Sequence, residues 1–332
     1  MNIRRKCVAI FSLFLFGIVR ADAEFFLPTP NPSPQPEISY LQPTCDEMSN
    51  GGFGMVRENG ARYHGGIDIQ PVHWADDGEP MDSVFSINDG IVVYVNDDEH
   101  LSNYGKYVVV VHDGLNLPVH TLYAHLSAVN GELHIGDRVD GGRLLGVLGR
   151  TANDCGIPQE RAHLHFEIGL RLGNNENFQR WYDKRYGPDD SNYHGVWNGL
   201  NLVSFDPLPL LQNGFPLDIA QYVRGLPTAF VTRVHAHKVP EFLKRYPALQ
   251  DGMVGEENLC GYDVEWTWNS VPKSWRPHFS KKFSPQSPVL IYWDSRQLST
   301  AINYGSLVQN DQDEIYLGHR TQDVLEKILG KE

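Results

Sequence analysis

Cysteine is scarce in this sequence, and the closely spaced pairs typical of structural zinc clusters are missing. The 332 residues contain 4 cysteines, and no two of them are separated by only two residues. A zinc cluster built from cysteines is therefore not expected. Cys7 lies in a segment that we expect to be removed, which leaves Cys45, Cys155 and Cys260. In an oxidising compartment three thiols allow one disulfide, and Cys45–Cys155 is the first choice because both lie in the same expected domain.

Positive charge is also scarce. The sequence has 28 Lys and Arg against 41 Asp and Glu, which gives a formal net charge of -13. Proteins that bind nucleic acid need basic surfaces to meet the phosphates, so nucleic acid is not expected as a partner. Binding to anionic membranes or wall polymers should be weak except at local basic patches.

Long apolar runs are absent beyond the N-terminus. Residues 4–6 are basic, residues 7–19 form an apolar run of signal-peptide length, and Ala21 and Ala23 form a small-x-small cleavage site. This pattern predicts a signal peptide over residues 1–23 and export to the periplasm or the outside medium, with an uncleaved membrane anchor as the alternative. After cleavage, no stable membrane insertion is expected.

The segments that follow predict a mainly β fold. Residues 24–44 carry six prolines and predict an extended, mobile leader. Within residues 45–212, β-branched and apolar runs punctuated by Gly and Asp predict strands, at 87–95, 106–111, 119–126 and 164–168. Strands at this spacing favour an antiparallel β-sheet or a barrel-like sandwich.

Two other segments have a different composition. Residues 171–204 place Trp and Tyr among Asn, Asp and Gly, which predicts a long aromatic loop inserted into the domain. Residues 213–332 contain strand-like and helix-like patterns, with strands expected at 229–234 and 288–292 and helices at 240–246 and 323–329. They predict a smaller α+β C-terminal domain, whose role the sequence does not indicate.

One pair of histidines lies in a predicted strand. His163 and His165 are two residues apart, so both should point to the same face, while Leu164 and Phe166 pack on the other. Two neutral imidazoles side by side suit metal binding or proton transfer. The pair alone is a weak indicator, because such pairs also occur on solvated strand faces.

A second motif contains a histidine and an aspartate around two glycines, His64-Gly65-Gly66-Ile67-Asp68. The glycines disfavour a helix, so this is not the helical metalloprotease motif. A glycine turn leading into an extended segment can bring His64 and Asp68 to one point. With a second imidazole they would make a ligand set typical of catalytic zinc, with the fourth position open to water. In the alternative, Asp68 caps a turn and His64 lies on the surface.

The remaining histidines are judged by their neighbours. Strand alternation predicts that Thr121, Tyr123 and His125 share one face and that His120, on the other, is structural. His235 and His237 form another closely spaced pair without an accompanying carboxylate motif. We interpret them as surface or structural residues.

Several motifs together resemble the lysostaphin/LytM-type zinc metalloendopeptidases, which hydrolyse peptidoglycan. Residues 62–69 (RYHGGIDI) resemble the first metal motif of that family, residues 122–127 (LYAHLS) a middle strand, and residues 162–168 (AHLHFEI) its closing motif, in the family's order. The match covers about residues 50–212.

The resemblance implies the site residues and the activity. It implies one Zn²⁺ per chain bound by His64, Asp68 and His165, and two catalytic histidines, His125 and His163, in a groove with the metal on its floor. The implied substrate is peptidoglycan, cut in its stem peptides or cross-bridges. The two histidines would deprotonate the water, stabilise the oxyanion and protonate the leaving amine, and which does which stays open.

Two departures from the family pattern leave the substrate open. The link at 151–161 is longer and more charged than the usual glycine-rich link, and the stretch at 171–204 is longer than the usual turn. The alternative function is a catalytically silent LytM-like regulator or adaptor of other cell-wall hydrolases, with a possible protein partner bound through residues 213–332. All five implied site residues are present, which favours the enzyme.

Overall fold

The computed structural model describes residues 25–30, 48–153, 156–214, 216, 218–252, 255, 257–279 and 288–330. The expected signal peptide, most of the expected leader and the expected Cys45–Cys155 disulfide lie outside the described residues. Among the described residues, no helix is both long and apolar enough to cross a membrane.

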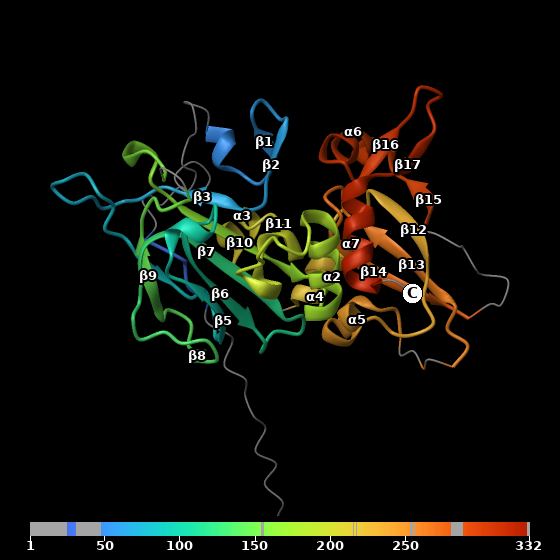
Figure 1. Ribbon diagram of the computed structural model, residues 1–332, viewed down its shortest axis with the longest axis horizontal. Helices are drawn as coiled ribbons and strands as arrows, with labels where there is room; N and C mark the ends of the chain where they lie inside the picture. The colour runs from blue at the N-terminus through green and yellow to red at the C-terminus, as the bar shows by residue number, and fades with distance from the viewer. Residues whose placement is uncertain are drawn as a thin grey trace, which may run out of the picture.

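The main element is an open antiparallel sheet of nine strands, with β11-β10-β7-β6-β5-β8 as its path, while β3 pairs with β10 and β9 joins β7 to β4 (Figure 1). Its strands are β3 (Ile67–Ile69), β4 (Ser83–Phe85), β5 (Gly90–Asn96), β6 (Lys106–His112), β7 (Val119–Val129), β8 (Arg138–Val139), β9 (Leu144–Leu148), β10 (Leu164–Arg171) and β11 (Leu202–Phe205). The mainly β, antiparallel fold is confirmed, and over the described chain the sheet does not close into a barrel.

A hairpin and short helical turns decorate this sheet. The hairpin consists of β1 (Gly54–Arg57) and β2 (Arg62–His64). The 3₁₀ turns are η1 (Met48–Gly51), η2 (Glu99–Leu101), η3 (Gln159–Arg161), η4 (Gly195–Trp197), η5 (Gly199–Asn201) and η6 (Pro247–Leu249).

The described part of the leader packs onto the sheet. The backbone N–H of Phe26 donates to Ile87 O at 2.9 Å, and that of Phe85 donates to Pro28 O at 2.9 Å. Phe25 and Leu27 pack against the buried residues of the same core. The expectation of a mobile leader is wrong for residues 25–30, because Phe25 and Leu27 are partly buried against the core and the backbone is hydrogen-bonded to the sheet domain.

The C-terminal region, residues 213–332, contains a second sheet with helices around it. Its strand order is β14-β13-β12-β15, with a separate hairpin, β16-β17. The strands are β12 (Phe230–His235), β13 (Gly261–Trp266), β14 (Pro272–His278), β15 (Val289–Trp293), β16 (Leu307–Gln309) and β17 (Ile315–Leu317). The helices, including the connecting α3, are α3 (Leu208–Asn213), α4 (Ile219–Gly225), α5 (Glu241–Arg245), α6 (Ser295–Tyr304) and α7 (His319–Leu329).

The two regions share one hydrophobic core. Ile168 and Leu170 of β10 are buried in the same cluster as Phe230 and Trp266 of the C-terminal sheet. The two regions therefore lie side by side against each other (Figure 1). Burial of this apolar area stabilises both, so neither is expected to be independent of the other.

The prediction of a long aromatic loop at 171–204 is wrong for residues 175–186, which form a helix. α2 (Asn175–Tyr186) begins at Asn174, whose side chain accepts from the backbone N–H of Asn177 at 2.8 Å. Phe178, Trp181 and Tyr182 are buried at helical spacing. Trp181 Nε1 donates to Asp323 Oδ1 of α7 at 3.1 Å. The loop interpretation failed because the aromatic face is covered by α7, which lies far along the sequence.

Candidate active site

Three side chains of the first motif and the closing motif meet on one face of the sheet. β3 pairs with β10 so that Asp68 lies directly opposite His165, and directly opposed residues share a face. His64, at the end of β2, approaches from the hairpin. Gly66 makes the close approach possible, because a Cβ there would lie 2.3 Å from Phe166 O.

The atoms of these three residues converge closely. His64 Nε2 lies 3.0 Å from His165 Nδ1 and 3.0 Å from Asp68 Oδ1, and His165 Nδ1 lies 3.1 Å from Asp68 Oδ1. All three side chains are buried. Within the described ranges, they form the one group of three or more His, Cys, Asp or Glu that could hold a metal ion. Two imidazole nitrogens and a carboxylate oxygen are a ligand set that zinc accepts, so the residues fit that ion.

The other ring nitrogens of the two histidines have oxygen partners. His64 Nδ1 lies 2.6 Å from Gly52 O, and His165 Nε2 lies 2.8 Å from Glu167 Oε1. Each contact orients its imidazole so that the opposite nitrogen faces the other two side chains, which is the outer-shell arrangement found around metal ligands. Glu167 in turn accepts from Tyr104 Oη at 2.7 Å and from Ser204 Oγ at 3.0 Å.

Glu167 was not found by the sequence analysis. It lies two residues beyond His165 on the same strand, so the alternation that joined His163 to His165 could have included it. Tyr104 and Ser204 come from other segments, and no sequence signal pointed to them.

The two oxygens of Asp68 face different groups. Oδ1 faces the imidazoles, while Oδ2 accepts from the guanidinium of Arg57 in β1. Burial alone would raise the pKa of Asp68, but the charges of His163 and His64, with hydrogen bonds from His165 and His64, hold this pKa well below its usual range. The carboxylate therefore stays ionised, with Oδ1 directed to the imidazoles. Arg57 is a second contact that the sequence analysis missed.

His163 and His125 lie beside this group. His163 Nε2 is 3.4 Å from Asp68 Oδ1, and the rings of His163 and His125 have centroids 4.8 Å apart. His163 Nδ1 lies 2.7 Å from Arg161 O, and His125 Nδ1 lies 2.7 Å from Thr151 O. Burial lowers the pKa of both imidazoles, so at neutral pH both are neutral and each can accept a proton at Nε2.

His125 reaches this face in a way that strand alternation did not predict. Tyr123 is buried in the core on the opposite face, with Phe166 directly opposite it on β10. β7 then carries one extra residue against β6, and His125 has a left-handed backbone with φ 62°. The expectation that Tyr123 and His125 share a face is therefore wrong, because the bulge turns His125 toward the site.

His120 keeps the structural place expected for it. It is buried with 2% exposure, and burial lowers its pKa to about 4. The imidazole is therefore neutral at pH 7.

The sequence of this region matches one family. Residues 62–178 match the family model of Peptidase family M23. This segment is a peptidase family M23 domain. The M23 match contains all five of His64, Asp68, His125, His163 and His165. No curated protein matches the chain in sequence.

Several solved structures are similar to parts of the chain. A putative glycyl-glycine endopeptidase LytM from Ruminococcus gnavus is 24% identical over 58% of this chain and 62% of its own, with a TM-score of 0.34. The catalytic domain of lysostaphin from Staphylococcus simulans is 21% identical over 49% of this chain and 87% of its own, with a TM-score of 0.28. A zinc-containing peptidase from Vibrio cholerae is 24% identical over 39% of this chain and 36% of its own, with a TM-score of 0.27. The chain thus covers less than two thirds of the length of the first of these structures.

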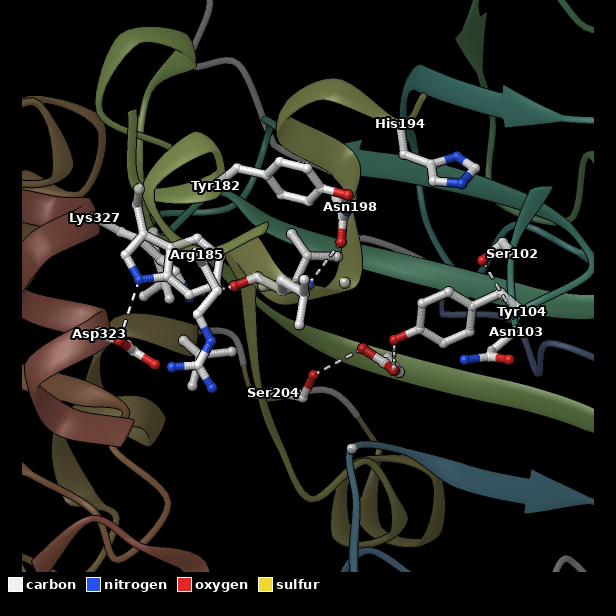
Figure 2. Close-up of a pocket in the computed structure, with 18 of the residues that line it drawn as sticks. Ser102, Asn103, Tyr104, Tyr182, Arg185, His194, Asn198, Ser204, Asp323 and Lys327 are labelled. Carbon is white, nitrogen blue, oxygen red and sulfur yellow. Dashed lines mark hydrogen bonds between the residues drawn. The ribbon is translucent and has the colours of Figure 1, made fainter. Parts of the chain in front are cut away.

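The M23 site opens into a large cavity. Its volume is about 900 Å³, and its lining includes His165, Glu167 and Tyr104. Figure 2 shows Tyr104 on one side of this cavity and Asp323 and Lys327 of α7 on the other. The C-terminal region therefore supplies a wall of the cavity.

Proposed function

We propose that this protein is an exported zinc metalloendopeptidase that hydrolyses peptide bonds in peptidoglycan stem peptides or cross-bridges. The observation that carries the proposal is the convergence of His64 Nε2, Asp68 Oδ1 and His165 Nδ1 within 3.1 Å of one another. The M23 family match supports the reaction class and the cell-wall substrate.

One Zn²⁺ per chain would be held by His64, Asp68 and His165. When bound, zinc polarises a peptide carbonyl and lowers the pKa of a water molecule from about 16 to roughly 7. Glu167 and Gly52 O orient the two ligand imidazoles through their outer nitrogens. Arg57 balances the charge of Asp68 at Oδ2, and its Nη2 also lies 3.2 Å from His64 Nε2.

The proton transfers fall to His125 and His163. Both imidazoles have Nδ1 on a backbone carbonyl, so Nε2 is the atom that takes a proton from the attacking water. The same atom then gives a proton to the leaving amine. Their ring centroids lie 4.8 Å apart, and the imidazole that has taken the proton of the water can then donate from Nε2 to the developing oxyanion.

The second candidate is a silent regulator or adaptor with this fold. Such a protein needs no ordered ligand set, and the outer contacts of His64 and His165 would then serve no purpose. The arrangement of the five side chains therefore favours the enzyme.

The decisive experiment measures zinc content and peptidoglycan digestion together, for wild type and His165→Ala. We expect one zinc per wild-type chain and new peptide termini, and both should be lost in the variant. A wild-type chain without zinc and without cleavage would contradict the enzyme and support the regulator. N-terminal sequencing of the exported chain tests the expected start at Glu24.

A further inference from the structure

The cavity beside the candidate metal centre extends from the M23 domain to the C-terminal region. Its lining includes His165, Glu167 and Tyr63 of the M23 side, together with Arg185 of α2 and Arg320 and Lys327 of α7. The cavity is therefore built jointly, and a substrate held at the metal ligands would lie beside α2 and α7.

Aromatic contacts connect Tyr63, next to the candidate metal ligands, with Arg320 of α7. The rings of Tyr63 and Tyr304 have centroids 4.7 Å apart, and the Arg320 guanidinium lies 5.4 Å from the centroid of Tyr304. Tyr63 directly precedes the candidate ligand His64. The distance from His64 to Arg320 is therefore one that about three or four residues of extended peptide would span. The separation suits a group a few residues away from the scissile bond.

The acidic groups of the cavity already have hydrogen-bond donors. Asp190 accepts from Tyr182 Oη at 2.8 Å, Asp323 accepts from Trp181 Nε1 at 3.1 Å, and Glu167 accepts from Tyr104 and Ser204. These carboxylates are thus partly satisfied without the arginines.

Two arginines that line the cavity have no carboxylate paired with them in the described part of the chain. Arg185 and Arg320 are exposed, and neither makes an ion pair with the acidic residues in the described part of the chain, although Arg320 stacks on Tyr304. By contrast Arg62, which also lines the cavity, pairs with Glu58 at 2.8 Å.

Lys327 also lines the cavity, and it is buried. Lys327 is 5% exposed, its Nζ donates to Leu200 O at 2.6 Å, and it lies 3.7 Å from the centroid of the Trp181 ring. Burial is the main reason that its pKa falls to about 7; Asp323 opposes the fall, and the charges of Arg320 and Arg185 add to it. Both arginines are therefore close enough to the Lys327 ammonium to lower its pKa. This local concentration of positive charge occurs in a chain that is acidic as a whole.

We propose that Arg185 and Arg320 form a subsite for a carboxylate of the peptide substrate. The inference rests on the proposed function and narrows its substrate class to carboxylate-bearing peptides. Guanidinium groups bind carboxylates with paired, charge-assisted hydrogen bonds. A neutral cross-bridge, such as a run of glycines, offers this subsite nothing.

The test uses cross-linked muropeptide dimers in two forms, native and with their carboxylates converted to amides by carbodiimide and ammonia. Wild-type protein should show a kcat/KM about tenfold to a hundredfold higher for the native dimers, as expected for charged hydrogen bonds. The preference should shrink as salt is added. The double variant Arg185→Gln, Arg320→Gln should cleave both forms with equal kcat/KM.

Two controls keep the outcomes separate. Arg180→Gln removes a cation of α2 that pairs with Glu176 and does not line the cavity, and it should keep the wild-type preference. Zinc content equal to wild type shows that the double variant is folded. A double variant that still prefers native dimers overturns the subsite. If neither form is cleaved, the proposed function fails, and calorimetric binding of the two dimers still tests the subsite.

Discussion

Two pairs of histidines with the same spacing occur in this molecule, one in each sheet region. His163 and His165 are buried, at 5% and 6% exposure, and both lie within 3.4 Å of Asp68 Oδ1. His235 and His237 lie at the end of β12, where their Nε2 atoms are 2.8 Å apart and His237 is exposed. Over the part of the chain that the structure describes, no carboxylate joins the second pair in a three-ligand group.

The difference between the pairs lies in what surrounds them. The first pair is joined by a carboxylate that is 97 residues away in sequence, and its outer nitrogens are fixed by Glu167 and a backbone carbonyl. In the second pair, His237 is exposed to water, whereas Nδ1 of His235 is buried. Spacing alone therefore does not predict a site, whereas a convergent carboxylate and fixed outer nitrogens do.

The largest effect should come from removing an imidazole that lies beside the ligands without being one. His125→Ala should keep stoichiometric zinc and lower kcat by about 10²- to 10⁴-fold, because it removes a proton-transfer group. Zinc content and peptide release are measured on the same sample. Full activity in this variant would show that His125 takes no part in the reaction.

A smaller effect is expected from the hydrogen bond between Glu167 and His165. Glu167→Gln should weaken zinc binding by about tenfold to a hundredfold, since it weakens the hydrogen bond that orients His165. Competition with a chromogenic chelator gives the affinity. Unchanged affinity would mean that the strand alone orients His165; Glu176→Gln, on the exposed face of α2, is the matched control.

His112 is a buried histidine outside the candidate metal site, so its burial can be tested for an effect on stability alone. His112 is fully buried, and its ring nitrogens lie 2.9 Å from Asp89 O and 2.9 Å from Thr121 Oγ1. Burial lowers its pKa to about 4, below the unfolded value, so the unfolded chain takes up the proton first as the pH falls. The stability that His112 contributes is present above pH 6.5 and lost between pH 6.5 and 4, by about 3 kcal/mol.

Urea unfolding at pH 7 and pH 4.5 measures this loss. His112→Asn, whose amide can still donate to Asp89 O, should lose less stability over this interval than the wild type. Equal losses in the two proteins would show that other buried groups account for the acid sensitivity.

The smallest effect is expected from removing the second histidine pair, His235 and His237. The double variant His235→Ala, His237→Ala should leave zinc content and peptidase activity unchanged and shift the free energy of unfolding by only about 0.5 kcal/mol. Loss of a metal equivalent in this variant would contradict the distinction drawn between the two pairs.

Much of the M23 domain could be predicted from local sequence. The β-branched runs predicted strands that the structure contains as β5, β6, β7 and β10. The spacing of His163 and His165 predicted a shared face, and Leu164 and Phe166 are indeed buried on the other. These predictions succeeded because strand alternation depends only on neighbouring residues.

Other features could not be read in this way. The helical conformation of α2 depends on its burial against α7, more than 130 residues later. Arg57 and Tyr104 reach the site from separate segments. Local patterns carry no information about which distant segment covers a face, so the loop interpretation of residues 171–204 was the natural one.

The sequence by itself determined the strands, the two-residue spacing of the imidazoles and the glycine turn between His64 and Asp68. Only the tertiary structure decided that β3 pairs with β10 in the register that sets Asp68 opposite His165. It also decided that a bulge with φ 62° turns His125 to the same face, and that Arg320 of α7 lines the cavity. The physical reason is that alternation and turns are set by bonds between neighbours, whereas register, bulges and shared walls are set by burial between segments far apart in sequence.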